Sequence, residues 1–223
     1  MKPGEVTLIV GAGSGLSASL AKLFARDTAK LAPLAAETGA LPIACDATDA
    51  AQVEAMFGAV EARWGVPDLV VYNAGYRARG PFVELDPLEV ERSIRVSAFG
   101  GFLAAQAAAR RMLPRGAGAI FFTGASASVK GYAESAPFAM GKFALRGLAQ
   151  SLARELAPKG IHVAHFVIDG GILSPRGDAR AGTRGPDGML LPEEIAKTYL
   201  AVYRQHRSAW TWEVELRPWV EKF

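Results

Sequence analysis

The chain has almost no cysteine and few histidines. Cys45 is the only cysteine among 223 residues, which excludes an internal disulfide framework and a cysteine-based metal site. We expect it to be a small buried residue at the end of a strand. The three histidines, His162, His165 and His206, show no ligand spacing with nearby acids. We therefore predict no metal site, and structural roles for His162 and His165 in a strand-like run.

An excess of one charge and long apolar runs are also lacking. The 25 basic and 22 acidic residues leave a net charge of only +3, and no Lys/Arg run is interleaved with aromatic residues. A nucleic-acid partner is therefore not predicted. No stretch approaches the roughly 18 apolar residues that a membrane span needs, and no signal peptide is visible. We expect a cytoplasmic protein without membrane contact, with residues 1–223 forming one domain.

Short apolar runs alternate with longer segments of helical period. The predicted strands are EVTLIV, ALPIAC, DLVVYNAG, AGAIFFTG and GIHVAHFVIDGG, which begin at residues 5, 40, 68, 117 and 160. Continuous apolar strands that alternate with helices indicate a parallel sheet covered on both faces. The predicted fold class is α/β, a doubly wound, mostly parallel, Rossmann-like sheet in a single domain. Its binding crevice should lie at the carboxyl ends of the strands.

A glycine turn, VGAGSGLS, stands between the first predicted strand and the first predicted helix. Gly11, Gly13 and Gly15 would let the backbone approach a pyrophosphate at the positive end of the helix. The strict G-x-G-x-x-G spacing fails because Leu16 occupies its last position, whereas G-x-x-x-G fits. Such turns also use glycine for purely steric reasons, so the turn alone does not identify a nucleotide site.

The stretch 174–192, SPRGDARAGTRGPDGMLLP, is rich in glycine, proline and arginine. An irregular loop of this length in a compact domain is usually a functional lid or a disordered segment. We expect a flexible substrate loop here.

Lys142 lies four residues after Phe138, so both fall on one face of a predicted helix among small apolar residues. An isolated lysine in such a place either extends its ammonium to solvent or has a function. The glycine turn, YNAG at 72–75, TGASAS at 123–128 and FAMGK at 138–142 follow one another in a familiar order and at familiar intervals. Together they resemble the short-chain dehydrogenase/reductase family over nearly the whole chain.

The resemblance implies a Rossmann-type fold that binds NADP or NAD and transfers hydride to or from a small-molecule carbonyl or alcohol substrate. It implies cofactor contacts in several places. The phosphate-binding turn would be Gly11, Gly13, Ser14, Gly15 and Leu16; the adenine would meet Asp46 and Ala47; the floor near the cofactor would be Asn73, Ala74 and Gly75; and the nicotinamide amide and phosphates would meet Gly170, Ile172 and Ser174. Asp169 stands where the family has proline.

In this family, the lysine binds the nicotinamide ribose and lowers the pKa of a tyrosine four residues earlier, which exchanges a proton with the substrate oxygen. The resemblance gives the lysine's role to Lys142. A serine about a dozen residues before the tyrosine polarises the carbonyl, and Ser126 fits this serine best, with Ser128 second. The tyrosine position, however, is Phe138, which has no oxygen.

The proton relay is altered at a second position, because Ser97 stands where the family usually has an asparagine that holds a water. Tyr132 and Tyr76 are the best substitutes for the missing tyrosine, although both can be ordinary loop residues. General acid–base catalysis is worth roughly 10²–10⁴ in rate, so carbonyl reduction without a substitute should be slow. The alternative function is a catalytically weak or inactive nucleotide-binding or assembly protein on the same fold.

A third departure concerns the second strand of the family fold, whose end selects NAD or NADP. Here LAKLFAR runs directly into DTAKLAPLAAETGA, which has the pattern of the next helix. Roughly ten residues are absent relative to a βαβ unit of about 30 or more. Either residues are skipped between Arg26 and Asp27 or the protein lacks the strand. We favour a skipped segment, which predicts that these two residues are not covalent neighbours.

Two long segments, SAFGGFLAAQAAARRM and FAMGKFALRGLAQSLARELA, are rich in alanine and glycine. They permit close helix packing between subunits, as in related proteins, so we expect a homodimer or homotetramer. Alternatively, they only cover the sheet within one subunit. The C-terminal AWTWEVELRPW could pair as a strand or pack its tryptophans across a two-fold axis.

Overall fold

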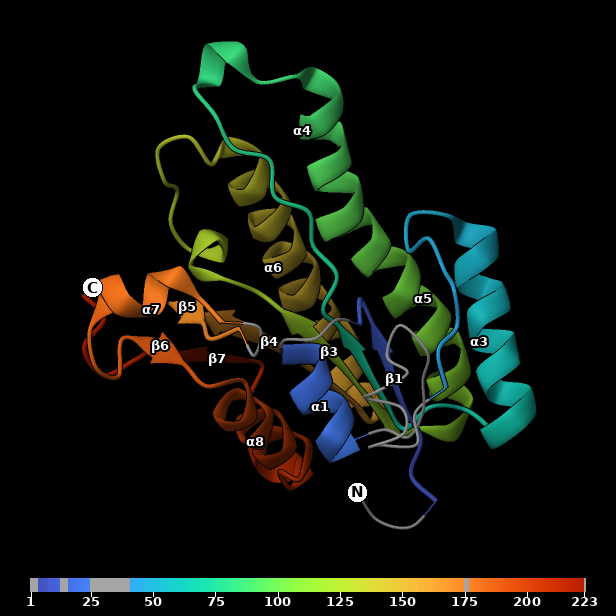
Figure 1. Cartoon of the computed structure of the whole chain (residues 1–223). Coiled ribbons are helices and arrows are strands. Elements are labelled where there is room, and N and C mark those ends of the chain that lie inside the picture. The colour runs from blue at the N-terminus through green and yellow to red at the C-terminus, as the bar shows by residue number, and fades with distance from the viewer. Residues whose placement is uncertain (1–3, 13–15, 25–40, 175–176, 223) are drawn as a thin grey trace.

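The computed structural model describes residues 4–12, 16–24, 41–174 and 177–222. Its centre is a five-stranded sheet in the order β1-β2-β3-β4-β7, and all neighbouring strands are parallel (Figure 1). The strands are β1 (Thr7–Val10), β2 (Leu69–Tyr72), β3 (Gly118–Thr123), β4 (Ile161–Ile168) and β7 (Glu213–Leu216). The predicted parallel sheet is confirmed.

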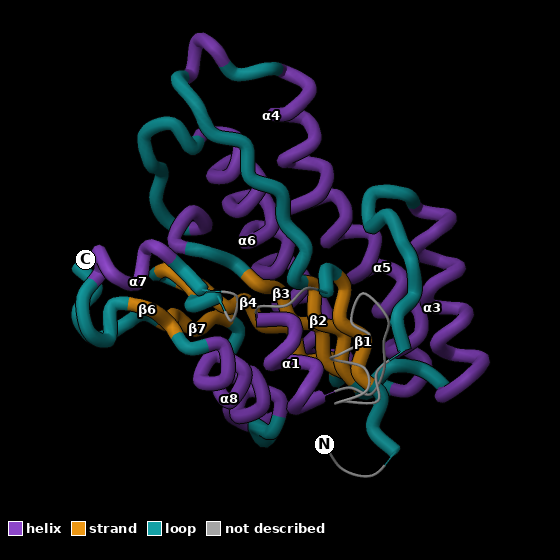
Figure 2. The backbone as a smooth tube through the Cα atoms, in the orientation of Figure 1, coloured by secondary structure: helices purple, strands orange, loops and turns teal. Residues whose placement is uncertain are grey.

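The register of the sheet brings the strand ends together. Val10 pairs with Tyr72, Tyr72 with Phe122, and Phe122 with His165. The turns that follow β1, β2 and β3 therefore leave the sheet at the same edge (Figure 2). β2 and β4 are buried along their whole length, as mainly apolar sequences predict for central strands, although β4 also buries His162 and His165.

Helices cover both faces of this sheet. One face carries α1 (Leu16–Phe24) and α8 (Pro192–Tyr203) around a core that includes Phe121, Phe166 and Tyr199. The opposite face carries α3 (Ala50–Trp64), α5 (Gly100–Met112) and α6 (Ala136–Leu156). The described part of the chain is thus the predicted Rossmann-like layered domain.

The segment 87–113 is one of those with helical period in the sequence, but it does not form one continuous α-helix. The structure has α4 (Pro87–Ile94), one π-helical turn (Arg95–Phe99) and then α5. α5 starts tightly against α6 and the sheet, because a Cβ at Gly101 would lie 2.6 Å from Leu145 Cδ1 of α6 and 3.4 Å from Tyr72 Cδ1 of β2. The glycines of this segment are therefore needed for packing within one subunit. A π turn inside an α-helix is frequently found at a functional site, and this one contains Ser97.

The predicted strand at 40–45 is wrong for the residues described. Within 41–45, Leu41 makes an isolated bridge and the residues after it form no ladder. Ile43 and Cys45 are half-buried and pack against the core on the α3 side. The segment thus contributes apolar contacts without hydrogen-bonded strand pairing, and Cys45 does not end a strand. Burial raises the pKa of the Cys45 thiol, as do the nearby charges of Asp46 and Asp49.

The stretch 174–192 is not without structure. Its described residues include α7 (Ala179–Arg184), whose first turn is capped by Asp178, and β6 (Met189–Leu190). β6 pairs in parallel with β5 (Gly171–Ile172). Local capping and this short pairing give the segment the order that its composition did not predict.

The C-terminal segment AWTWEVELRPW contains β7, which pairs with β4 of the same chain, His165 opposite Glu213. The segment thus pairs as a strand within one chain, and a contact across a two-fold axis stays a prediction. The Arg26–Asp27 junction and the predicted helix after it lie outside the described residues.

No helix in the described ranges is long and apolar enough to cross a bilayer. The same residues contain no cluster of three or more His, Cys, Asp or Glu side chains suited to a metal ion.

Candidate active site

The first turn of the site is fixed by backbone and side-chain bonds. Gly11 has φ +90°, and a Cβ there would lie 2.4 Å from Ala74 N, so no other residue fits without a shift. Ser17 Oγ donates to Gly11 O at 2.7 Å, and Asn73 Nδ2 donates to Ser17 Oγ at 2.6 Å. Asn73 N donates to Val10 O at 2.8 Å. Asn73 and Ser17 thus hold the turn after β1 against the turn after β2.

The remaining residues of the glycine turn are only partly described. Gly13, Ser14 and Gly15 lie outside the described residues. Leu16 opens α1 and is 5% exposed, in the core beneath the turn. The N-terminal end of α1 therefore faces the turn after β1, where helix N–H groups and the helix dipole favour an anion such as a phosphate.

Lys142 points inward rather than to solvent. Only 4% of the residue is exposed, and its Nζ donates to Thr123 O at 2.7 Å. A Cβ at Gly75 would lie 3.5 Å from Nζ. Burial lowers the pKa of Lys142 to about 8, because the charged form loses water. The lysine therefore lies within the site formed by the ends of β2 and β3, as a functional role would require.

Phe138 lies next to Lys142, as the i to i+4 spacing predicts. Its half-buried ring has its centroid 5.8 Å from Lys142 Nζ. The guanidinium carbon of Arg77 lies 4.8 Å from the same centroid. An aromatic ring without an oxygen thus occupies a place between two cations.

Ser97 is fully buried in the π-helical turn. Its Oγ accepts from Tyr76 N at 3.5 Å, and a Cβ at Gly75 would lie 3.9 Å from that Oγ. A Cβ at Gly141 would lie 2.8 Å from Ser97 Cβ. The structure therefore brings Ser97 together with Gly75 and the helix that carries Lys142.

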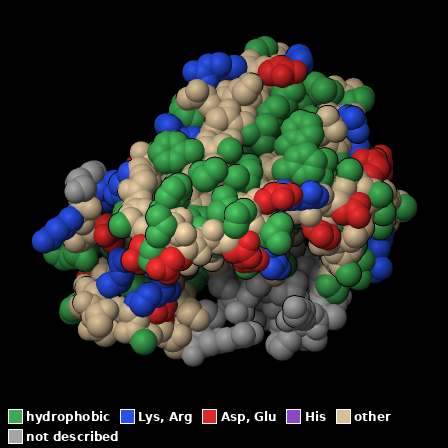
Figure 3. All heavy atoms as spheres, turned by 90° about the horizontal axis from the view of Figure 1, so that it is seen from above, with side chains coloured by type: hydrophobic (Ala, Val, Ile, Leu, Met, Phe, Trp, Pro, Cys, Tyr) green, Lys and Arg blue, Asp and Glu red, His purple; other side chains and the backbone are tan. Residues whose placement is uncertain are grey.

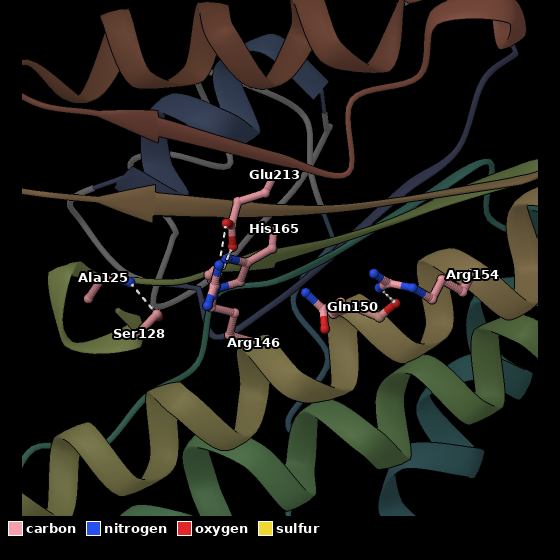
Figure 4. Close-up of polar contacts among 7 residues, drawn as sticks. All are labelled: Ala125, Ser128, Arg146, Gln150, Arg154, His165 and Glu213. Carbon is pink, nitrogen blue, oxygen red and sulfur yellow. Dashed lines mark hydrogen bonds and ion pairs between the residues drawn. The ribbon is translucent and has the colours of Figure 1, made fainter. Parts of the chain in front are cut away.

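The two candidate serines differ in their surroundings. Both belong to the short 3₁₀ helix Ser126–Ser128 that follows β3. Ser128 is fully buried, and its Oγ accepts from Ala125 N at 3.1 Å (Figure 4). Ser126 is half-buried, and its hydroxyl has no hydrogen bond to the part of the chain that the structure describes. Ser128 thus stabilises the turn, whereas the hydroxyl of Ser126 remains available.

The two candidate tyrosines also differ. The Tyr76 hydroxyl donates to Glu89 Oε2, and the Arg92 guanidinium lies 4.4 Å from its ring centroid. The bond to Glu89 is the main cause that raises the pKa of Tyr76. Tyr132 is 43% exposed, with Lys130 Nζ 5.9 Å from its ring centroid. Tyr76 is therefore engaged by its neighbours, and Tyr132 is the more accessible of the two.

Asp169, in the place of the family's proline, is tied to three segments. Its N–H, which a proline would lack, donates to Leu216 O at 2.8 Å. Its carboxylate, 4% exposed, lies 3.2 Å from Lys130 Nζ and 3.3 Å from Arg217 Nη2. The substitution thus links the end of β4 to β7 and to the loop after Ser128.

The residues expected to meet the nicotinamide and phosphates continue from Asp169. Gly170 follows it directly, Ile172 lies in β5 opposite Leu190, and Ser174 O accepts from Gly177 N at 3.2 Å. This segment leaves the sheet at the carboxyl end of β4, next along from the ends of β2 and β3 (Figure 2).

Asp46 and Ala47, the expected adenine contacts, precede α3. Asp46 is exposed, and its Oδ1 accepts from both Thr48 N and Thr48 Oγ1 at 2.8 Å. The backbone bond from Thr48 is the first cause that lowers the pKa of Asp46. The carbonyl of Ala47 packs on α5, since a Cβ at Gly100 would lie 2.8 Å from it.

A buried polar cluster anchors α6 one turn beyond Lys142. Arg146 binds Glu213 through two bonds, Nε–Oε2 at 2.6 Å and Nη2–Oε1 at 2.7 Å. His165 Nδ1 lies 3.0 Å from Glu213 Oε2, and the three side chains converge between α6, β4 and β7 (Figure 4). Burial lowers the pKa of His165 to about 4, so it is neutral at pH 7. As predicted, His165 has a structural environment; so does His162, which stacks on Trp210 with 4.7 Å between ring centroids.

Three residues of this site escaped the sequence analysis. Ser17 and Thr123 act through a hydroxyl and a backbone carbonyl that no motif requires. Arg77 directly follows the motif residues 72–75 and Tyr76, and only its position after that turn could have drawn attention to it.

Known proteins provide an independent view of this arrangement. A family profile described as "short chain dehydrogenase" matches residues 5–179. D-threitol dehydrogenase of Mycolicibacterium smegmatis is 31% identical over 220 residues, which cover 86% of this chain and 83% of that protein.

Solved structures agree. The crystal structure of a short-chain dehydrogenase from Rhodopseudomonas palustris has a TM-score of 0.81 and 35% identity, with 97% of this chain and 99% of the other covered. A gluconate 5-dehydrogenase from Burkholderia cenocepacia, in complex with NADP and tartrate, has a TM-score of 0.81 and 26% identity, with 96% and 94% covered.

Proposed function

The chain belongs to the short-chain dehydrogenase family, and from that premise we propose that it is an NAD(P)-dependent oxidoreductase with an altered proton relay. In the direction of reduction, hydride would pass from the nicotinamide to the carbonyl carbon of a small substrate, and a proton would reach the carbonyl oxygen. The bound cofactor would supply the hydride. The chain's own residues would bind and orient the substrate and deliver the proton.

The buried ammonium of Lys142 is the observation that carries this proposal. Placing a charge in a protein interior costs on the order of several kcal/mol unless the charge is paired and hydrogen-bonded. An ammonium has three donors, and one of them bonds to Thr123 O. No carboxylate among the described residues pairs with it. The hydroxyls of a nicotinamide ribose are acceptors of the kind that the remaining donors need.

The turn after β1 supports a dinucleotide cofactor, NADP or NAD. The close approach of Ala74 to Gly11 leaves no room for a side chain, and the start of α1 favours a phosphate. Asp46 offers an exposed carboxylate for the adenine. Ile172 and Ser174 follow the end of β4, where we place the nicotinamide amide.

In the substrate half of the site, we assign Ser126 to the carbonyl oxygen, because its hydroxyl is available. The proton must come from a group other than Phe138. Tyr132 is the remaining tyrosine candidate, since Tyr76 is bound to Glu89. The segment 174–192 would border the substrate, as the sequence analysis expected.

A second candidate function is a nucleotide-binding or assembly protein with weak or no catalysis. Phe138 and Ser97 favour it, because both changes remove groups that handle protons in the family. Lys142 disfavours a protein with no cofactor at all, since such a protein would gain little from a buried cation.

We also propose a homodimer or homotetramer. Phe99 and Phe102 stack with 6.1 Å between ring centroids, and Phe99, Phe102, Met140 and Phe143 are each at least 40% exposed. Figure 3 shows hydrophobic side chains over much of the face seen from above. Phe82, Val83 and Leu88 are also exposed. A monomeric mass by light scattering would contradict this proposal. The cytoplasm stays the predicted compartment.

Titration and turnover test the function together. NADPH and NADH are titrated into the protein, and their oxidation is followed with a panel of carbonyl compounds. The proteins compared are native, Phe138→Tyr, Tyr132→Phe and Lys142→Ala. Cofactor binding with turnover that Tyr132→Phe abolishes would identify Tyr132 as the proton donor. Cofactor binding with background rates in all four proteins would favour the binding protein.

A further inference from the structure

Arg77 lies beside the Phe138 ring and has no acidic partner among the residues that the structure describes. Its guanidinium carbon is 4.8 Å from the centroid of the Phe138 ring, whose other cationic neighbour is Lys142. Within 4–12, 16–24, 41–174 and 177–222, Arg77 makes no hydrogen bond or ion pair. Partial burial lowers the pKa of Arg77, and the like charges of Arg79 and Arg180 lower it further.

Two other arginines near this place are paired, whereas Arg79 makes no hydrogen bond or ion pair within the described residues. Arg180 binds Asp178 through Nε–Oδ1 at 2.8 Å and Nη2–Oδ2 at 2.5 Å, and Arg92 lies 3.6 Å from Glu89. Arg77 and the nearby Arg79 therefore carry positive charges that no acid among the described residues pairs with. Like charges held close together destabilise a folded protein, and a bound anion would relieve that repulsion.

The acidic residues of the neighbouring loop form no ion pair with Arg77. Glu84, Asp86 and Glu89 line a groove of about 410 Å³ together with Arg79, not with Arg77. Asp86 caps α4 through Leu88 N at 2.9 Å, and Glu89 accepts from Tyr76. Asp86 and Glu89 are thus occupied by other groups, and the guanidinium of Arg77 lies over the Phe138 ring.

The loss of the tyrosine hydroxyl fits this arrangement. A guanidinium stacks well on an aromatic face, and its planar fork matches a carboxylate through two parallel hydrogen bonds. We propose that Arg77, supported by the Phe138 ring, binds the carboxylate of an oxo-acid or hydroxy-acid substrate whose reacting carbon lies beside Lys142. This inference rests on the proposed function for the reaction, but the anion site itself can be tested without turnover.

Isothermal titration calorimetry measures the affinity of this site for anions. Malonate, the neutral malonamide and inorganic phosphate are titrated into the native protein, with and without saturating NADPH. The same titrations use Arg77→Met, Arg77→Lys and the control Arg110→Met, which changes an exposed arginine on α5. Thermal unfolding of each variant checks that it is folded.

We expect malonate to bind the native protein and Arg110→Met equally, and at least about tenfold more tightly than malonamide. Arg77→Met should weaken malonate binding about tenfold or more, and Arg77→Lys should weaken it less, because lysine keeps the charge but loses the fork. Malonate affinity should fall with rising salt.

Three results would overturn the inference: equal binding of malonate and malonamide, an unchanged malonate Kd in Arg77→Met, or phosphate binding about tenfold tighter than malonate. The last would point to a phosphate ester. Failure of NADPH to bind, with malonate still bound through Arg77, would refute the proposed dehydrogenase and leave the anion site standing. Bound NADPH without malonate binding would refute only the anion site.

Discussion

The turns after β1 and β2, with Gly11, Ser17 and Asn73, form what we call the cofactor side of the site. The start of α6 and the segments facing it, with Phe138, Ser97 and Arg77, form the substrate side. Lys142 stands between them. On the cofactor side, hydrogen bonds of 2.6–2.8 Å and a close backbone approach fix each residue. On the substrate side, we propose that Phe138 and Ser97 stand in place of a tyrosine and an asparagine, and so lack the oxygen and nitrogen atoms that the family resemblance implies there.

We infer from this difference that cofactor binding and proton transfer can change separately in one site. A Phe ring fills the space of a Tyr ring, so removal of the hydroxyl leaves the packing around Lys142 intact. The cofactor side has no comparable freedom, since Gly11 tolerates neither a side chain nor a change of φ. We therefore expect large losses from changes on the cofactor side and gains or modest losses on the substrate side.

The largest effect should come from Gly11→Ala. The new Cβ would lie 2.4 Å from Ala74 N and would impose φ +90° on a residue that disfavours it. Strain and overpacking of this kind cost about 2–4 kcal/mol of the free energy of unfolding, and cofactor binding should be lost with the turn. Urea unfolding and NADPH titration measure both. The control Gly147→Ala has open space around it in α6, and should be neutral or stabilising by up to about 1 kcal/mol.

Phe138→Tyr should act in the opposite direction on the substrate side. If no other group replaces the tyrosine, turnover of a carbonyl substrate should rise by roughly 10²–10⁴, because a phenol beside Lys142 restores general acid catalysis. Thermal stability should change little, since the ring already fits. Phe143→Tyr, at an exposed position of the same helix, is the matched control. Steady-state rates that respond equally to both changes would contradict the assignment of Phe138.

The buried charge of Lys142 should be visible in the pH dependence of stability. Its pKa falls from an ordinary value near 10.5 to about 8 in the folded protein, so the unfolded chain binds more protons between these values. The free energy of unfolding should therefore rise with pH from about 8 to 10, by about 2 kcal/mol relative to Lys142→Met. Above pH 10 the buried Tyr72 and Tyr199, whose pKa values are raised, act in the opposite sense. Urea unfolding of both proteins at pH 7–10 tests this; parallel pH curves would mean that Lys142 is not desolvated.

The smallest effects should separate the two serines of the turn after β3. Ser128→Ala removes the bond to Ala125 N and should cost about 1 kcal/mol of stability with little change in turnover. Ser126→Ala should leave stability unchanged and lower kcat/KM, most clearly in the Phe138→Tyr background where rates are higher. If Ser128→Ala lowered kcat/KM and Ser126→Ala lowered stability, Ser128 would be the serine that acts on the substrate and Ser126 the one that stabilises the turn.

The sequence predicted most of the fold because its strands are continuous apolar runs and its helices have a clear period. It failed at 40–45, where apolar residues pack on the core without a strand ladder. It also missed the order of 174–192, which depends on capping by Asp178 and on pairing with β5. Neither contact leaves a periodic signal, so pattern alone could not predict them.

In the candidate site, Asn73 and Lys142 could be predicted because each belongs to a short motif whose residues are close together in the sequence. Arg77 could not, because no motif contains it, and neither could the contacts of Asp169 with Lys130 and Leu216, which come from segments far away in the chain. That Lys142 is buried and bonded to Thr123 O also required the fold, because helical spacing alone permits an exposed lysine equally well.

Cofactor affinity tests the central claim most directly, because that claim separates an intact cofactor side from an altered substrate side. NADPH and NADH titrations of native protein, Phe138→Tyr and Lys142→Met should show micromolar binding of at least one cofactor to the native protein. The Kd of Phe138→Tyr should lie within about threefold of the native value. The Kd of Lys142→Met should be about tenfold higher or more, because this variant loses hydrogen bonds from a charged donor. Absence of binding to the folded native protein, or equal binding to all three, would contradict the account.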